Sequence, residues 1–372
     1  MKKKIKVLET IRQGKVGGGE THVLELCSNL DLTRFEPVVL SFTDGPMVEE
    51  LRRRGIRTEV IYTESGFDFK VKAGVDAFIQ REKFDIVHAH GTRAMSNVFA
   101  SASKYRIPLM YTVHGWSFHP DQPFFIRKMR EYSEWFLTSK ATKTICVSKS
   151  NELDGIKRFG MKRSEVVYNA IDLEKFNPDK QFSDIRAELG IDANAPLIGF
   201  IVRITVQKDP LSMLRAIKLV AEKRKDVVLL MVGEGDLKQA AMDLATELGI
   251  TRNVVFQPFR SDIPAILNAI DVYCLPSLWE GFPIGILEAM AMAKCVVATP
   301  VDGNPEVVFE NQTGLFTETE NPEMLAEKLL QLINDSDLRA TLAKNARTFV
   351  TQNFAIKPMV QHLEDIYSNL LK

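Results

Sequence analysis

The sequence contains few cysteines, no long apolar run and no excess of either charge. Each of its four cysteines stands alone in an apolar stretch (Cys27, Cys146, Cys274 and Cys295). This spacing excludes a disulfide scaffold and a cysteine metal site, and it predicts reduced thiols in a buried core. No apolar run reaches about 18 residues, the length typical of a transmembrane helix. Lys plus Arg and Asp plus Glu both number 48, so charge gives no reason to expect nucleic acid as a partner.

Signatures of metal and nucleophilic catalysis are also missing. We find no paired His/Asp set and no Asp-x-Asp at the end of a predicted strand, and we therefore expect no bound metal. The spacing supports no Ser-His-Asp or Cys-His arrangement. If this protein binds a phosphorylated ligand, backbone amides and cationic side chains must neutralise the ligand's charge.

The first residues, Met1 to Leu8, are basic but contain no apolar signal core. We therefore expect a cytoplasmic protein. Two basic runs, Lys2–Lys4 and Arg52–Arg54, leave two interpretations open. They form either a solvated surface or a peripheral contact with the inner face of the plasma membrane.

A length of 372 residues favours two domains over one. Short β-branched runs alternate with amphipathic helical patterns, which predicts parallel sheets covered by helices on both faces. The segment 169–195, rich in Asp, Asn, Lys and Pro, separates two such sets and is the predicted linker. We therefore predict an α/β protein of two doubly wound domains, 1–172 and 173–356. Ligands are expected beyond the carboxyl ends of the strands, in a cleft that the domains face.

The predicted strands of the first set are Ile5–Ile11, Pro37–Phe42, Thr58–Tyr62, Asp85–Ala89, Leu109–His114, Thr144–Ser148 and Val166–Tyr168. Those of the second set are Leu197–Val202, Val227–Val232, Val254–Gln257, Val272–Leu275 and Cys295–Ala298. Three helical segments follow Asn321, and the last has apolar residues at helical spacing from Lys357 onward. This last helix must therefore pack on another part of the chain.

The most informative segment is Glu280–Ala291, which follows the predicted strand Val272–Leu275. Glu280 lies in a turn, Pro283 suits the first turn of a helix, and Glu288 lies inside that helix. A strand, a glycine-bearing turn and a helix N-terminus predict an anion site. Because two carboxylates beside it repel a phosphate, we assign them to hydroxyl groups of a sugar or a ribose.

A glycine-rich loop, Gly17-Gly18-Gly19, follows the first predicted strand and opens a helix. It matches neither the dinucleotide fingerprint nor the P-loop. One interpretation is a tight turn in which glycine only supplies a positive φ. We favour the other, a close backbone approach to a ligand, because three successive glycines exceed what a turn requires.

Three histidines end predicted strands. His114 ends Leu109–His114, where functional residues collect, although a lone histidine is more often structural. His88 and His90 end another strand. We expect these two to point to opposite faces of the sheet, so that at most one reaches the cleft.

Two cations, Arg203 and Lys208, share one loop after the strand Leu197–Val202. Such a pair, opposite a helix N-terminus, suits a diphosphate without a metal, whereas either cation alone is compatible with a solvated loop. Gly233 also ends a predicted strand, in Gly233-Glu234-Gly235-Asp236. Here a turn capped by Asp236 and a ligand contact are equally good interpretations.

Taken together, these motifs resemble the retaining glycosyltransferases of family 4, nucleotide-sugar enzymes with the two-Rossmann-domain GT-B fold. The resemblance covers essentially the whole chain. Its most specific part is Glu280 to Glu288, followed by Asp302–Val308 and Thr313–Leu315. It also includes the motifs Gly17–Glu20, Thr112–Gly115, Asn169–Asp172, Arg203 with Lys208, and Gly233–Gly235.

The resemblance implies a role for each motif. Arg203 and Lys208 would bind the donor diphosphate, and Glu288 would hold the ribose hydroxyls. Glu280 would contact the transferred sugar, while His114 would lie near its reacting carbon. Backbone contacts to the donor would come from Gly18, Gly19 and Gly233, and from Gly281, Phe282, Pro283 and Ile284. Pro258 and Phe259 would frame the base, and the helix 357–372 would return to the N-terminal domain, where the acceptor binds.

The resemblance also implies a reaction. A hexose would pass, with retention and without a metal, from a nucleoside diphosphate sugar to a sugar or lipid-linked acceptor. Uridine is our expectation for the base, and bacterial surface polysaccharide or glycolipid biosynthesis for the context. Two alternatives remain: a nucleotide-sugar epimerase of the same fold, and a non-catalytic nucleotide-sugar-binding partner protein. Val202 departs from the family, which has glycine before the arginine. This departure bears on donor preference.

Overall fold

The computed structural model describes residues 3–14, 17–119 and 121–372. It divides the chain into two compact units. Unit 1 comprises Met1–Ala170 and Ile356–Lys372, and unit 2 comprises Ile171–Ala355. The boundaries drawn from the sequence, after 172 and after 356, fall two residues and one residue further along the chain.

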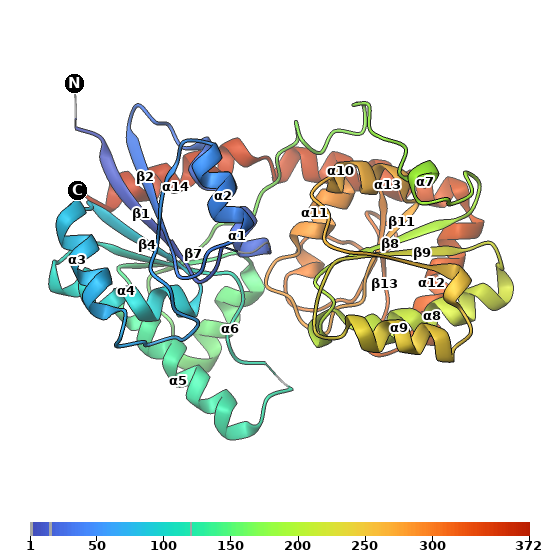
Figure 1. Ribbon diagram of the computed structural model, residues 1–372, viewed down its shortest axis with the longest axis horizontal. Helices are drawn as coiled ribbons and strands as arrows, with labels where there is room; N and C mark the ends of the chain where they lie inside the picture. Colours follow the sequence, from blue (N-terminus) through green and yellow to red (C-terminus); the bar gives the residue numbers. More distant parts are fainter. Residues whose placement is uncertain (1–2, 15–16, 120) are drawn as a thin grey trace. The chain divides into compact units, whose positions relative to one another are not determined.

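Unit 1 contains a seven-stranded sheet in which every pairing is parallel, in the order β3-β2-β1-β4-β5-β6-β7 (Figure 1). The strands are mostly buried apolar runs, as expected for a sheet covered on both faces. They are β1 (Ile5–Ile11), β2 (Phe35–Ser41), β3 (Arg57–Val60), β4 (Ile86–His90), β5 (Leu109–Val113), β6 (Lys143–Cys146) and β7 (Ser164–Val166).

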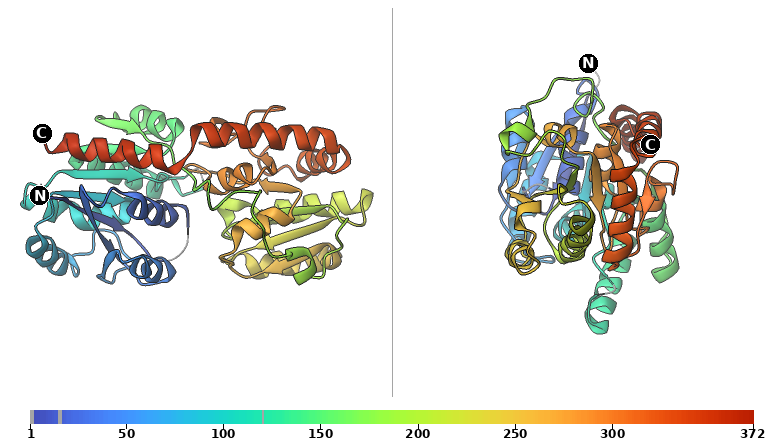
Figure 2. Two further views of the ribbon diagram at one scale, coloured as in Figure 1. Left: turned by 90° about the horizontal axis from the view of Figure 1, so that it is seen from above. Right: turned by 90° about the vertical axis from the view of Figure 1, so that its right-hand side faces the viewer.

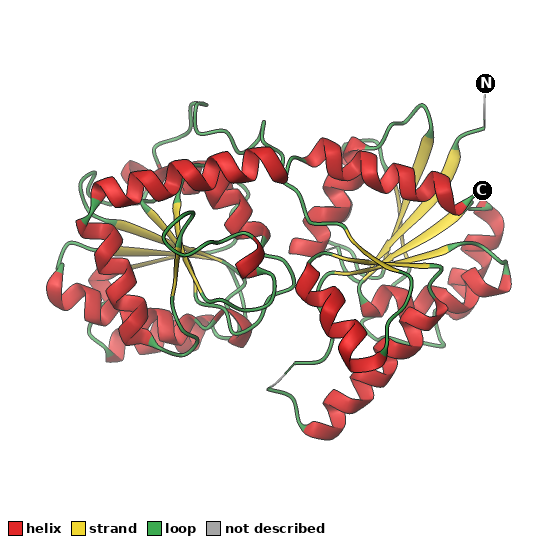
Figure 3. Cartoon of the chain, turned by 180° about the vertical axis from the view of Figure 1, so that it is seen from behind, coloured by secondary structure: helices red, strands yellow, loops and turns green. Residues whose placement is uncertain are grey.

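Helices lie on both sides of the strands in each unit (Figure 3). In unit 1 they are α1 (Gly18–Asn29), α2 (Pro46–Arg53), α3 (Lys72–Glu82), α4 (Thr92–Lys104), α5 (Phe124–Lys140), α6 (Lys149–Phe159) and α14 (Ile356–Leu370). The last helix, α14, lies along unit 1 in Figure 2. Its Met359, Leu363 and Tyr367 join Leu26 of α1 and Phe35 of β2 in one buried cluster.

Unit 2 contains a six-stranded sheet, again parallel throughout, in the order β10-β9-β8-β11-β12-β13. Its strands are β8 (Leu197–Ile201), β9 (Val228–Val232), β10 (Val254–Gln257), β11 (Val272–Leu275), β12 (Cys295–Ala298) and β13 (Leu315–Phe316). We did not predict β13, because two residues are too short to give a periodic signal.

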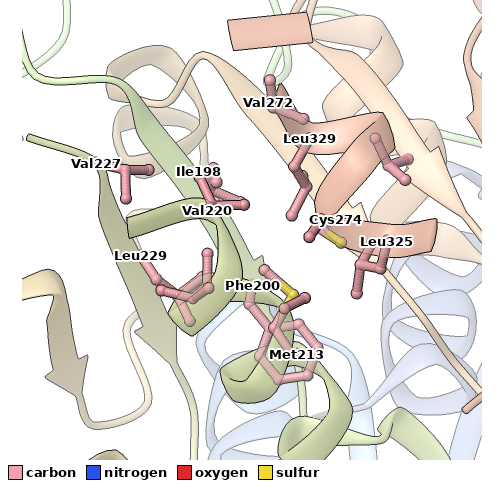
Figure 4. Packing of buried hydrophobic residues seen from close by; sticks show 14 of the residues in the cluster. Ile198, Phe200, Met213, Val220, Val227, Leu229, Val272, Cys274, Leu325 and Leu329 are labelled. Carbon is pink, nitrogen blue, oxygen red and sulfur yellow. The ribbon is translucent and has the colours of Figure 1, made fainter. Parts of the chain in front are cut away.

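The helices of unit 2 lie on both faces of its sheet. They are α7 (Ile185–Glu188), α8 (Pro210–Lys223), α9 (Lys238–Glu247), α10 (Ile263–Ala269), α11 (Ile284–Ala291), α12 (Pro322–Asn334) and α13 (Ser336–Asn353), with 3-10 turns at Val206–Lys208, Thr251–Asn253 and Asn304–Glu306. Figure 4 shows Met213 of α8 beside Phe200 of β8, with Leu325 of α12 in the same buried cluster. The predicted linker 169–195 is not wholly irregular, because Asp184 caps the short helix α7 by accepting a hydrogen bond from the Ala187 amide.

Both sheets reverse their strand order at one place, between β1 and β4 in unit 1 and between β8 and β11 in unit 2. The two units are therefore doubly wound Rossmann-like folds, as the sequence predicted. In such sheets the loops after the two central strands diverge to opposite faces and leave a crevice at the carboxyl ends. This crevice is where functional side chains are to be sought in each unit.

Two further predictions can be compared with the structure. All four cysteines are unpaired and buried, in agreement with the prediction of reduced core thiols. Among the described residues, no helix combines the length and the apolar character that crossing a membrane requires.

Candidate active site

The loop after β8 carries the two predicted cations. Arg203 is exposed, whereas Lys208 ends a 3-10 turn and is half-buried. Asp209 follows with a φ of 49° and caps α8 by accepting a hydrogen bond from the Ser212 amide at 3.1 Å. Pro210 begins the helix, and the fixed φ of proline suits the first helical position. The cap and the proline thus fix the start of α8 directly beside Lys208.

Lys208 forms an ion pair with Glu280, which follows β11 on the other side of the switch point. Glu280 is buried, and its own amide donates a hydrogen bond to Asp302 Oδ2 at 2.6 Å. The structure thus brings together one residue predicted to bind phosphate and one predicted to bind sugar. The ion pair also removes the apparent conflict of a carboxylate in an anion site, because Lys208 compensates its charge.

Helix α11 does not include Pro283 in its first turn, although the sequence predicted that it would. Pro283 is its N-cap rather than part of its first turn, and Ile284 is the first helical residue. The Ile284 amide already donates to the Phe282 carbonyl at 3.1 Å. A phosphate at this helix start must therefore use other amides of the turn, or displace that bond.

Glu288 lies one turn into α11 and is half-buried. Burial raises the pKa of Tyr273 well above its usual value, and the negative charges of Glu288 and Glu280 raise it further. Both carboxylates are therefore close enough to Tyr273 to act on it. A β-carbon on Gly285 would lie 2.4 Å from the Tyr273 hydroxyl, so glycine is required where α11 crosses β11.

Gly233 lies at the end of β9 with a φ of 144°, and a β-carbon there would lie 1.9 Å from the Val202 carbonyl oxygen. Glycine is therefore needed where the end of β9 contacts the end of β8, and this requirement does not depend on a ligand. The alternative of an Asp236 cap is wrong, because α9 has Leu237 as its N-cap and no side-chain cap bond. Pro258 and Phe259 follow β10 and are exposed.

In unit 1, Gly18 and Gly19 form the first turn of α1, and Gly17 is the N-cap with an extended φ of 177°. The interpretation that these glycines supply a positive φ is therefore wrong. A β-carbon on Gly19 would lie 3.3 Å from His114 Cδ2, so the absence of a side chain lets α1 pack against that ring. Lys15 and Val16 of the same loop lie outside the described residues.

His114 directly follows β5 and is half-buried, and its Nδ1 atom is buried. Burial, and then the neighbouring His22 and His90, hold the pKa of His114 well below its usual value. The ring is therefore neutral. His114 Nε2 lies 3.1 Å from His90 Nδ1, whereas His114 Nδ1 is buried without a partner in the described part of the chain.

The prediction for His88 and His90 is wrong. Both contact Glu9 of β1, and their ring centroids are 4.1 Å apart. Residues two positions apart on a strand point to the same face, so the alternation was applied incorrectly. Glu9, His88 and His90 also form a group with metal-ligand chemistry, which the sequence did not suggest.

Sequence reasoning assigned no role to Glu9, Tyr367 or Asp302. Glu9 lies in the part of β1 that is fully buried, and a buried carboxylate demands partners, so this signal was available. Tyr367 donates to Glu9 Oε1 at 2.7 Å across most of the chain. Only the fold could reveal that contact.

Comparison with known proteins agrees with this geometry. Residues 16–175 match the family described as Glycosyltransferase Family 4, and residues 181–349 match the Glycosyl transferases group 1. The chain is 28% identical over 311 residues to an Escherichia coli UDP-Gal:alpha-D-GlcNAc-diphosphoundecaprenol alpha-1,3-galactosyltransferase, covering 82% of this chain and 80% of that one. It is also 25% identical over 349 residues to a D-inositol 3-phosphate glycosyltransferase of Corynebacterium efficiens, covering 89% and 80% of the two chains.

Among solved structures, the chain resembles Anabaena Alr3699/HepE in complex with UDP and glucose. The TM-score is 0.87 at 25% identity, and the match covers 98% of this chain and 99% of that one. The two family models, the relatives and the two doubly wound units together identify a glycosyltransferase of the GT-B fold. The chain belongs to the glycosyltransferases of family 4.

Proposed function

We propose that this protein transfers a hexose from a UDP-sugar to a sugar or lipid-linked acceptor, with retention of the anomeric configuration. Bacterial surface polysaccharide or glycolipid biosynthesis is the context we infer. The observation that carries the proposal is the Lys208–Glu280 ion pair at the switch point of unit 2, with Glu288 nearby on α11. Two relatives support the donor class, since one is named for UDP-Gal and another was crystallised with UDP and glucose.

Different residues of unit 2 bind different parts of the donor. Arg203 is exposed, and Lys208 is held in the same loop by its ion pair with Glu280. Together these two cations can neutralise a diphosphate without a metal. Lys208 has three N–H donors and can bind Glu280 and a phosphate oxygen at once. Glu288 receives the ribose hydroxyls, and exposed Pro258 and Phe259 receive the base.

In this mechanism Glu280 acts on the transferred sugar. Its carboxylate accepts hydrogen bonds from sugar hydroxyls, while Lys208 compensates its charge. Same-face attack by the acceptor hydroxyl, with the leaving phosphate taking its proton, requires no enzyme nucleophile. In unit 1 the carboxylate linked to His114 through His90 is Glu9, and its hydrogen bonds occupy both of its oxygens. Glu9 is therefore unsuited to nucleophilic attack.

A hydrolysis screen over common nucleotide sugars tests this proposal. Proton NMR of the first-released sugar reports its anomeric configuration, and a parallel reaction contains excess chelator. We expect a UDP-hexose to be consumed fastest, with the donor's own anomer released first and no loss of rate in chelator.

Each contrary outcome has a defined meaning. Interconversion of donor sugars without release would identify an epimerase, and binding without turnover would identify a partner protein. Release of the opposite anomer would exclude retention, and inhibition by chelator would exclude the metal-free mechanism.

An exposed apolar surface on helix α5 of unit 1 supports the proposal that the acceptor is linked to a lipid. Its side chains Phe124, Phe125, Met129, Tyr132 and Trp135 are all exposed, Phe125 to 84%. Exposed apolar groups gathered on one helix mark an interaction site. We name this set the α5 surface.

The charges of α5 favour an anionic lipid surface as its partner. Both carboxylates of the helix, Glu131 and Glu134, are buried, and Glu131 pairs with Lys128. Arg130 is exposed, and its guanidinium donates to the neutral Ser117 carbonyl, so its positive charge is kept. The exposed part of α5 thus combines aromatic groups with positive charge, as membrane-surface helices do. The basic runs considered from the sequence are less suited, because Arg53 and Arg54 pair with Glu50 and Lys3 pairs with Asp85. Lys2 lies outside the described residues.

Co-sedimentation with vesicles tests this surface. We expect binding to vesicles that contain phosphatidylglycerol, weaker binding to pure phosphatidylcholine, and loss of binding in Phe125→Ser/Tyr132→Ser. Phe69→Ser is the matched control, because Phe69 is 83% exposed in the same unit but lies outside α5. Equal binding by both variants would reject the surface. Self-association that only the α5 variant abolishes would identify a protein interface instead.

A further inference from the structure

A fully buried polar cluster lies at the switch point of unit 1, behind His114. Glu9 of β1 accepts hydrogen bonds from His90 Nε2 at 2.8 Å and from Tyr367 at 2.7 Å, and His88 Nδ1 lies 3.1 Å away. A carboxylate with three such donors stays ionised in the interior. Although burial opposes its charge, His88 and His90 hold the pKa of Glu9 well below its usual range.

The hydrogen positions then follow one after another. An ionised carboxylate only accepts, so His90 Nε2 must carry a hydrogen. Burial lowers the pKa of His90 to about 4, so its ring is neutral and its Nδ1 has a free lone pair. His114 Nε2 lies 3.1 Å from His90 Nδ1 and must therefore be the donor in this hydrogen bond. Since His114 is also neutral, its Nδ1 carries no hydrogen.

We propose that Glu9 is a positioning residue that acts through His90 to hold His114 in the Nε2–H tautomer. His114 Nδ1 is then an unprotonated acceptor, buried without a partner in the described part of the chain. A buried acceptor without a partner is costly, and a hydroxyl group of a ligand can satisfy it. His114 thus accepts a hydrogen bond from a sugar hydroxyl and donates none to the leaving group. This last step rests on the proposed function, whereas the tautomer does not.

The same residues do not need a metal to explain their arrangement. His88 and His90 both contact the Glu9 carboxylate directly. Tyr367 bonds to Glu9 Oε1 and His88 Nδ1, and Thr112 bonds to His88 Nε2. A bound ion would have to replace these hydrogen bonds. It would also take the His90 Nε2 lone pair and thereby reverse the predicted tautomers.

Long-range proton–nitrogen NMR of protein labelled with 15N-histidine reads the tautomer of each ring directly. The chain has six histidines, so single substitutions can assign every signal. In the wild-type protein without ligand we expect His90 and His114 both in the Nε2–H form. A His114 signal in the Nδ1–H form, or a wild-type spectrum changed by stoichiometric Zn²⁺, would overturn the proposal.

Two variants separate positioning from folding. Glu9→Met removes the acceptor at the head of the chain, so we expect a mixture of His114 tautomers. Tyr367→Phe removes a hydrogen bond to the same carboxylate but leaves His90 its acceptor, so we expect the wild-type tautomer. If Glu9→Met does not fold, His90→Phe breaks the chain at its next member and predicts the same mixture. An unchanged His114 tautomer in a folded Glu9→Met or His90→Phe variant rejects the proposal.

A functional measurement completes the test. In Glu9→Met we expect kcat/KM for the nucleotide sugar to fall about tenfold, the order expected for one lost hydrogen bond, while UDP binding stays unchanged. An equal loss of UDP affinity would indicate general damage to the protein and contradict a positioning role. Inactive wild-type protein with the predicted tautomer would reject the proposed function but leave the tautomer assignment standing.

Discussion

The two units share one strand order but use its switch point differently. In unit 1 the polar groups, Glu9, His88 and His90, are buried on the strands themselves and bond to one another. In unit 2, Arg203, Lys208 and Glu280 lie on loops after the strands, and Arg203 is exposed. The same topology thus carries a buried hydrogen-bond network in unit 1, and charged side chains on the loops after the strands in unit 2.

This difference indicates that the two sites respond to different perturbations. Groups on strands are fixed by the sheet, so their loss affects folding and the orientation of a neighbour. Groups on the loops after the strands lie where the proposed donor binds, so we expect their loss to affect the ligand. The following two predictions test that distinction, beginning with the larger effect.

Lys208→Ala should lower turnover at least about a hundredfold, because in the proposed mechanism it removes a charge that stabilises the departing diphosphate. Steady-state transfer or hydrolysis rates measure the effect. Lys238→Ala is the matched control, since Lys238 forms an ion pair with Glu234 in the same unit at 2.7 Å, and its rate should stay at the wild-type level. Thermal unfolding of both variants tests for loss of fold. Wild-type rates in Lys208→Ala would remove the distinction between the units.

Acid should destabilise unit 1 more than unit 2. The pKa values of His22 and His90 are lowered by burial to about 3 and about 4, while unfolded histidines bind protons near pH 6.5. Acid therefore favours the unfolded chain, and stability present at neutral pH is lost as the pH falls below about 6.5. Each histidine contributes about 1.4 kcal/mol per pH unit until its folded pKa is reached. Glu9, whose pKa is also lowered, adds a loss at lower pH.

Urea unfolding followed by tryptophan fluorescence measures this for each unit. Trp116 and Trp135 lie in unit 1, and Trp279 lies in unit 2. The variant Trp279→Phe therefore reports the unfolding of unit 1, and the double variant Trp116→Phe/Trp135→Phe reports that of unit 2. We expect the midpoint of unit 1 to fall more between about pH 7 and about pH 5. Equal shifts in both units would show that the buried histidines do not set the acid response.

Most of the fold was readable because apolar strands and helical crossovers follow simple periods. The bounds of β1, β10, β11 and β12 agree with the prediction to the residue. The short β13 and the helix α7 in the predicted linker gave no such signal. Among the candidate site residues, Lys208 and Glu280 could be identified because they follow predicted strands. Their ion pair depends on which strands are neighbours, and the sequence does not specify that directly.

Helix α14 has a consequence for how this protein is made. Unit 2 is one continuous segment, whereas unit 1 needs Tyr367 to satisfy Glu9 and needs Leu363 to fill its core. On the ribosome the first 170 residues therefore emerge before the helix that completes them. We expect unit 2 to reach its native state first, so that the part synthesised earliest matures last and depends longest on protection from aggregation.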